Sequence, residues 1–131
     1  MNQDEVLEFR RIEQEFEQLS QQLQLIEQNF NEMSELSLSL DEIEKENKEI
    51  LISIGRNIFI PVEIKEKKLI VGVGNKNFIR KSIPETKKII EGQNDKLADA
   101  KEKIMGKMQE LQEEMERLMK NINEKERIKN R

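Results

Sequence analysis

A heptad repeat runs through the first third of the chain and most constrains its fold. Apolar residues recur there at alternating intervals of three and four residues, at Phe9, Ile12, Phe16, Leu19, Leu23, Ile26, Phe30 and Met33. If Phe9 occupies position a, every a and d position from residue 9 to residue 33 is apolar, which is typical of a coiled-coil helix. Ser37 then interrupts the a row, and the apolar residues beyond it predict a shifted seam, at Leu36, Leu40 and Ile43.

A second heptad repeat occupies the C-terminal part of the chain. Position d holds Ile90, Leu97, Ile104, Leu111 and Leu118, and position a holds Met108, Met115 and Ile122, with Asn94 and Lys101 as polar exceptions. Two antiparallel registers fit the pattern: one pairs Phe9 with Leu118, and the other pairs Ile12 with Ile122. Either register predicts a helical hairpin roughly 60 Å long with both termini at one end.

The composition argues against a globular core and against catalysis. Charged residues make up 38% of the chain and aromatic residues 4%, with no tryptophan or tyrosine. This balance favours elongated helices, and the strict periodicity argues against disorder. The chain has no cysteine and no histidine, which excludes disulfides and thiolate sites and removes the commonest general base. We therefore expect no enzyme activity, no metal and no cofactor.

Charge and hydropathy limit the expected location and partners. No apolar run approaches the ~20 residues that a membrane-spanning helix needs, and no signal peptide is visible, so we expect a soluble cytoplasmic protein without membrane contact. Residues 1–50 carry a net charge of −10, residues 51–82 carry +5 and residues 83–131 carry +1. This distribution favours self-association over nucleic-acid binding, and only Phe59 and Phe78 could stack on bases.

The segment between the repeats predicts four short strands in two hairpins. The strands are expected at residues 51–54, 58–64, 69–73 and 77–81, with turns at 55–57 and 74–76. Pro61 cannot donate a ladder hydrogen bond, so its strand is expected at a sheet edge. Ser82 and Glu85 form a capping-box sequence, in which the Ser82 oxygen accepts from the Glu85 amide and the Glu85 carboxylate accepts from the Ser82 amide. We therefore divide the single domain into helix 1–48, hairpins 49–82 and helix 83–131.

The two predicted hairpins are too small to be stable alone, and their strand edges would stay unpaired in one chain. Pairing with hairpins of other chains in a closed barrel would remove those edges. The residues expected in this subunit assembly are the apolar ones of the four strands: Leu51, Ile52, Ile54, Ile58, Phe59, Ile60, Val62, Ile64, Leu69, Ile70, Val71, Val73, Phe78 and Ile79.

The central sequences "LISIGRNIFIPVEI" (51–64) and "LIVGVGNKNFIRKS" (69–82), with the helix entry "SIPETKKII", resemble the α-class subunit of prefoldin. The resemblance implies an α+β fold: a long antiparallel coiled-coil hairpin whose two β-hairpins join a multi-subunit β-barrel body. It further implies an ATP-independent holdase in which two α and four β subunits form a hexamer. Such a complex holds non-native polypeptides at its coil tips and delivers them to a group II chaperonin. The composition is compatible with an archaeal source.

A holdase must bind exposed apolar surface without reading sequence, and apolar burial is non-directional. The apolar residues expected near the helix ends are candidates for client binding: Val6, Leu7, Phe9, Ile12, Met119, Ile122 and Ile128. Phe9, Ile12 and Ile122 lie on the seam, where core packing is the favoured explanation, while the other four are equally explained as scattered surface residues. The alternative function is a structural or tethering coiled coil that binds no client.

Overall fold

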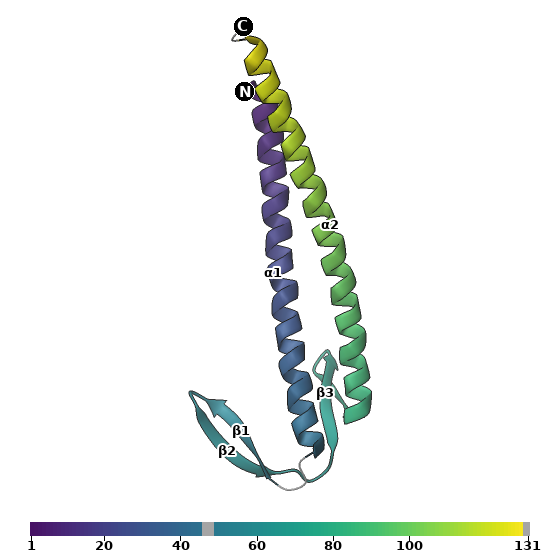
Figure 1. Cartoon of the computed structure of the whole chain (residues 1–131). Helices are drawn as coiled ribbons and strands as arrows, with labels where there is room; N and C mark the ends of the chain where they lie inside the picture. Colours follow the sequence, from purple (N-terminus) through teal and green to yellow (C-terminus); the bar gives the residue numbers. More distant parts are fainter. Residues whose placement is uncertain (46–48, 130–131) are drawn as a thin grey trace. The chain divides into compact units, whose positions relative to one another are not determined.

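The computed structural model describes residues 1–45 and 49–129 and confirms the predicted fold class. The elements follow in the order α1 (Gln3–Lys45), β1 (Glu49–Gly55), β2 (Ile58–Glu63), β3 (Lys68–Gly74), β4 (Asn77–Ser82) and α2 (Ile83–Lys129), as Figure 1 shows. Within the described part of this single chain, the strands form two separate antiparallel pairs and close no barrel. The predicted helices also included residues 46–48 and 130–131, which lie outside the described residues.

The chain divides into two compact units, which we name by their content. The terminal unit comprises residues 1–29 and 96–131, and the hairpin unit comprises residues 30–95. Each unit contains a segment of α1 and a segment of α2.

In the terminal unit, the two helices pack through the predicted apolar seam. Its buried side chains are Ile12 and Ile26 from α1 and Leu111 and Ile122 from α2. Ile12 and Phe16 line one groove together with Leu111 and Met115, which agrees with the register that pairs Phe9 with Leu118. The polar exception Lys101 is accommodated because its Nζ lies 2.6 Å from Oε1 of Glu27.

The hairpin unit has a small core where the helices meet the second hairpin. Leu40, Ile83 and Ile90 are buried together, and they pack against the partly buried residues Met33, Ile43 and Leu69. The predicted seam shift is wrong for Leu36, which is 42% exposed. Ser37 is half-buried instead, so the seam keeps its heptad spacing and tolerates one small polar side chain.

Asn94, the other polar exception, lies in the hairpin unit with its Oδ1 atom buried. This oxygen has no hydrogen-bond partner among the residues described. A buried carbonyl oxygen without a partner loses its hydration and gains nothing in return. The layer at Asn94 is therefore a weak point of the seam.

The start of α2 is fixed by side-chain capping, with one difference from the prediction. The Glu85 amide donates to Oγ of Ser82 at 3.2 Å, as expected of an N-cap serine. The Glu85 carboxylate, however, accepts from the Ser82 hydroxyl at 3.1 Å, where the capping box predicted the Ser82 amide as donor. Thr86 Oγ1 donates to the Ser82 carbonyl at 2.9 Å and adds a further local hydrogen bond.

Both hairpins close through two-residue turns in which the backbone is left-handed. The φ angles are +50° and +61° at Arg56 and Asn57, and +49° and +59° at Asn75 and Lys76. Positive φ at both central residues is the pattern of a type I′ turn, whose twist matches that of the flanking strands. The four strands lie where the sequence predicted them, with ends that differ by at most two residues.

Candidate subunit-assembly and client-binding surfaces

The apolar residues of the four strands are mostly exposed, and we call the fourteen predicted assembly residues the hairpin surface. Its exposed members are Leu51, Ile52, Ile54, Ile58, Phe59, Ile60, Ile70, Val73, Phe78 and Ile79. Its half-buried members are Val62, Ile64, Leu69 and Val71. Large exposed apolar surface is typical of interaction sites, so these residues stay candidates for subunit assembly.

In the first hairpin, β-branched side chains lie directly opposite one another. Ile52 of β1 pairs with Ile60 of β2, and Ile50 pairs with Val62. Alternate residues of a strand share a face, so these four side chains form one apolar face. Leu51 and Pro61 form a pair on the other face. Each of these strands has a ladder partner on one side only, which agrees with the edge position predicted for Pro61.

In the second hairpin, an aromatic ring covers a glycine. Gly72 of β3 lies opposite Phe78 of β4, and a Cβ atom at Gly72 would meet Cε1 of Phe78 at 3.3 Å. The ring takes the space that a side chain would occupy, which compensates for a glycine within a strand. Phe78 nevertheless remains 67% exposed, so its outer face is available to another chain.

A groove of about 730 Å³ runs between the last turns of α1 and the first hairpin. Ser39, Glu42 and Ile43 line it from α1, and the strand residues that line it are Glu49, Ile50, Leu51, Ile52, Ser53 and Phe59. The groove joins apolar side chains of the first hairpin to Ile43 of the helix. It enlarges the surface on which a neighbouring subunit could pack.

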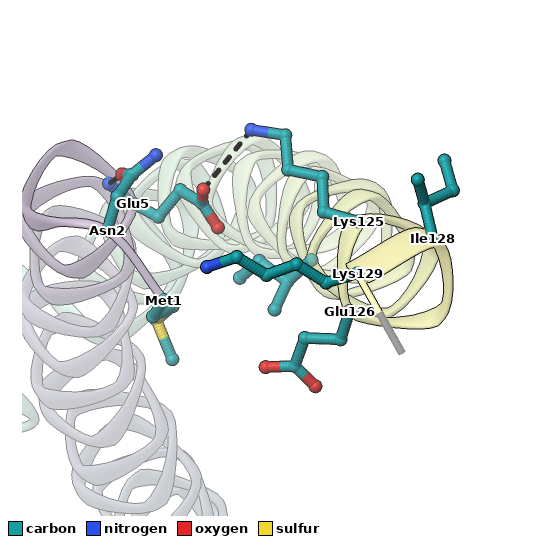
Figure 2. Close-up of a pocket in the computed structure, with 8 residues that line it drawn as sticks. Met1, Asn2, Glu5, Lys125, Glu126, Ile128 and Lys129 are labelled. Atoms are coloured by element: carbon teal, nitrogen blue, oxygen red, sulfur yellow. Dashed lines mark hydrogen bonds and ion pairs between the residues drawn. The ribbon is translucent and has the colours of Figure 1, made fainter. Parts of the chain in front are cut away.

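At the chain ends, the terminal unit contains a cavity of about 450 Å³ (Figure 2). It is lined by Met1, Asn2, Glu5, Ile122, Lys125, Glu126, Ile128 and Lys129. Lys125 and Lys129 reach from α2 towards the start of α1, whereas Ile128 points away from it (Figure 2). Nζ of Lys125 lies 3.2 Å from Oε1 of Glu5, so an ion pair joins the two helix ends. The cavity thus combines apolar lining with one cross-helix ion pair.

The predicted client-binding residues fall into three groups by burial. Ile12 and Ile122 are buried, with 2% and 5% of their surface exposed, and Val6 and Phe9 are half-buried. Leu7, Met119 and Ile128 are exposed, with Ile128 at 73%. Ile122 and Ile128 are both among the residues that line the cavity at the chain ends, and Met119 lines a separate opening of about 480 Å³ with Met115.

A second apolar groove, which the sequence did not predict, lies along the side of the terminal unit. We call it the lateral groove; its apolar lining residues are Ile12, Phe16, Leu111 and Met115 and its polar ones Glu13, Glu17 and Gln112. Phe16 holds an a position yet is 37% exposed. Its place in the heptad repeat predicted a seam position. Phe16 is nevertheless partly exposed, because a seam between only two helices is open to solvent on both sides. The size of phenylalanine at an a position is the only signal that the sequence offered.

Within residues 1–45 and 49–129, no group of three or more acidic side chains is arranged to hold a metal ion. No helix in the same ranges combines the length and hydropathy of a membrane span.

The fold defines a class of protein: a coiled-coil subunit with two exposed β-hairpins between its long helices. The family model described as "Prefoldin subunit" matches residues 12–127. The chain therefore belongs to the prefoldin family, as its resemblance predicted, and its two strand pairs are consistent with the α class. It is a chaperone-type subunit, and its partners include other prefoldin subunits.

A structural comparison agrees with the family assignment. The chain is similar to a chain in the cryo-EM structure of filamentous PFD from Methanocaldococcus jannaschii, with a TM-score of 0.72 and 19% sequence identity. The match covers 91% of this chain and 98% of that chain. At this identity the likeness shows the fold alone. A search of the curated proteins gives no significant match.

Proposed function

We propose that this chain is the α-type subunit of an ATP-independent chaperone that acts in the cytoplasm. Two such chains join four β-type prefoldin subunits, hold non-native polypeptides at the helix ends and deliver them to a group II chaperonin. The subunit performs no catalysis and requires no cofactor, nucleic acid or membrane. The 131 residues act as one domain, with helices for holding clients and hairpins for assembly.

The assembly part of the proposal rests on the hairpin surface. Ten of its fourteen apolar side chains are exposed in the single chain, and burying each one fully would contribute about 1.5–3 kcal/mol. Each strand also has an edge that another strand could pair with. Hairpins of β-type subunits would satisfy both needs by completing a closed barrel.

The client-binding part rests on one observation: two large apolar side chains are exposed near the chain ends, and one of them, Ile128, lines the cavity there. Leu7 is 57% exposed and Ile128 is 73% exposed, and neither occupies an a or d position of the seam. Packing of the two helices therefore does not require them. Apolar contacts without directional hydrogen bonds suit weak binding of many different unfolded sequences.

Client binding is tested by polar substitution of those two residues in the assembled complex. The double variant Leu7→Ser/Ile128→Ser should lose most of its ability to suppress aggregation of a chemically denatured test protein, measured by light scattering. The matched control is Leu25→Ser/Leu38→Ser, because Leu25 and Leu38 are 60% and 65% exposed elsewhere on α1. Equal suppression by both variants would reject the helix ends as the binding site.

A coarser test removes residues 1–12 and 119–131. If the trimmed complex keeps its mass and still suppresses aggregation fully, the client-binding site lies elsewhere. The mass of the complex formed with a co-expressed β-type subunit, measured by native mass spectrometry, tests the proposed ratio of two α to four β chains.

The second candidate function is a structural assembly that binds no client. The similar chain from Methanocaldococcus jannaschii comes from a filamentous PFD, and the exposed hairpin surface of the present chain would allow an extended homo-oligomer. Electron microscopy of the purified chain alone would show filaments under this alternative. Aggregation suppression would then be absent from both the filament and any complex with a β-type subunit.

A further inference from the structure

The lateral groove has an acidic rim beside its apolar lining. Phe16 and Met115 contribute partly exposed apolar surface, while Glu13 and Glu17 are exposed on the α1 side. The groove has a volume of about 440 Å³ and no lysine or arginine among its lining residues. It therefore presents an apolar surface next to uncompensated negative charge.

The two carboxylates of the rim lack cationic partners within the described residues. Neither Glu13 nor Glu17 forms an ion pair there. The nearby Arg11 contacts three other carboxylates, those of Glu8, Glu15 and Glu114. Since Glu13 and Glu17 are four residues apart on one helix, their like charges repel each other. A cation placed between them would relieve this repulsion.

From this arrangement we propose that the lateral groove binds segments of non-native polypeptide in which a large apolar side chain is flanked by lysine or arginine. The inference rests on the proposed chaperone function and names the class of client that it favours. The apolar side chain of the client packs against Phe16 and Met115. Its cationic neighbour lies between Glu13 and Glu17, where it replaces a repulsion between like charges with attraction.

The charge preference also makes a client complex sensitive to salt. The attraction between exposed charges decays over a screening length of about 10 Å at 0.1 M ionic strength, and this length becomes shorter at higher salt. Apolar contact with Phe16 is not screened in this way. Raising the salt concentration should therefore reduce the preference for cationic segments, while the affinity that comes from apolar contact is retained.

The test uses three fluorescently labelled peptides and the assembled complex of the full-length chain with its β-type partner. The peptides share one leucine- and phenylalanine-containing core, flanked by two lysines, two glutamines or two glutamates. Fluorescence anisotropy gives the dissociation constant of each at low and high salt. We expect the lysine peptide to bind most tightly and the glutamate peptide least tightly, with a difference that shrinks at high salt.

Two charge-neutralising variants locate the effect. Glu13→Gln/Glu17→Gln should weaken binding of the lysine peptide by about threefold to tenfold, the range expected when two exposed ion pairs are lost. The matched control, Glu32→Gln/Glu35→Gln, changes the net charge of α1 equally at two exposed residues outside the groove, and should leave binding unchanged. Phe16→Ser should weaken all three peptides, and thermal unfolding would verify that the variant remains folded.

Several results would overturn the inference. Equal affinity for the lysine and glutamate peptides would do so, as would equal losses in the Glu13/Glu17 variant and its control. A fall in the mass of the complex on Phe16→Ser would mean that another subunit covers the groove. If suppression of aggregation remains intact in these cases, only the inference about client charge fails. If the complex suppresses no aggregation at all, the proposed function fails as well.

Discussion

Nζ of Lys87 lies 2.6 Å from Oδ1 of Asp41 and joins the last turns of α1 to the first turns of α2. The same ammonium group lies 2.5 Å from Oε2 of Glu44. One turn of α1 thereby holds two carboxylates against a single lysine of α2. Lys67, from the segment between β2 and β3, donates to the carbonyl oxygen of Glu44 at 2.6 Å and satisfies a backbone acceptor near the helix end. These contacts hold the helices together beside the core formed by Leu40 and Ile83.

The hydrogen bond from Lys87 lowers the pKa of Asp41 below its usual value, with the positive charge of Lys87 as a further cause. A carboxyl group with a lowered folded-state pKa stabilises the fold above its unfolded pKa of about 3.9 and loses this contribution as pH falls through the folded value. We therefore expect Asp41→Asn to lower Tm near pH 6 and to reduce the drop in Tm on acidification below about pH 4. Thermal unfolding followed by circular dichroism measures both. An equal drop in the variant and the parent would contradict the assignment.

Ile83 is 2% exposed at the first position of α2, whereas Ile89 is 39% exposed six residues later. Ile83→Ala should lower the free energy of unfolding by about 2–4 kcal/mol, because it removes buried methyl groups and leaves a cavity. The same substitution at the exposed Ile89 serves as the control and should cost much less. Urea denaturation of both variants checks the difference. Similar costs at the two positions would show that Ile89 is buried by another subunit.

Replacing Asn94 should stabilise the seam. Its Oδ1 atom is buried without a partner among the described residues, so Asn94→Leu removes an uncompensated polar group and adds apolar contact. We expect the free energy of unfolding to rise by about 1–2 kcal/mol. Asn29→Leu, at an exposed position of α1, is the control. A polar residue at an a position also restricts register and partner choice, so native mass spectrometry should reveal a wider range of assemblies in the Leu variant. Destabilisation would mean that the oxygen is hydrogen-bonded in the assembly.

Assembly should be sensitive to charge on the hairpin surface. Phe78→Asp removes an exposed ring whose burial would contribute about 1.5–3 kcal/mol at each subunit contact, and it places a carboxylate there instead. We expect a smaller particle in size-exclusion chromatography with light scattering, while the helix content measured by circular dichroism is retained. Lys76→Asp, in the adjacent turn, introduces the same charged residue and should assemble normally, because aspartate tolerates the positive φ found there. Retention of full mass by the Phe78 variant would contradict the role of this surface.

The helices and strands could be predicted from sequence because their signals are local. The three-four spacing from Phe9 to Met33 specifies one helical face, and the alternation of Ile58, Ile60 and Val62 specifies a strand. The turns at Arg56–Asn57 and Asn75–Lys76 were located by their glycines and asparagines, although the residues with positive φ are not all glycine.

The exposure of individual side chains could not be predicted, because the spacing of apolar residues indicates which face of a helix a side chain lies on but not how much of that face is covered. Phe16 and Ile12 both follow the heptad pattern, yet one is 37% exposed and the other 2%. The antiparallel register was also open in the sequence, since hydrophobic layers one heptad apart are interchangeable. Leu36 was assigned to the seam on hydrophobicity alone, and the smaller Ser37 holds that place instead.

Met1 and Lys129 line the same cavity, and this proximity has a practical consequence for experiments on the chain. An affinity tag or fluorophore fused to either terminus would lie at the proposed client-binding site, where it could mimic a client or block its binding. Labels are better placed at Leu25 or Leu38, whose side chains are exposed on α1 and do not line this cavity.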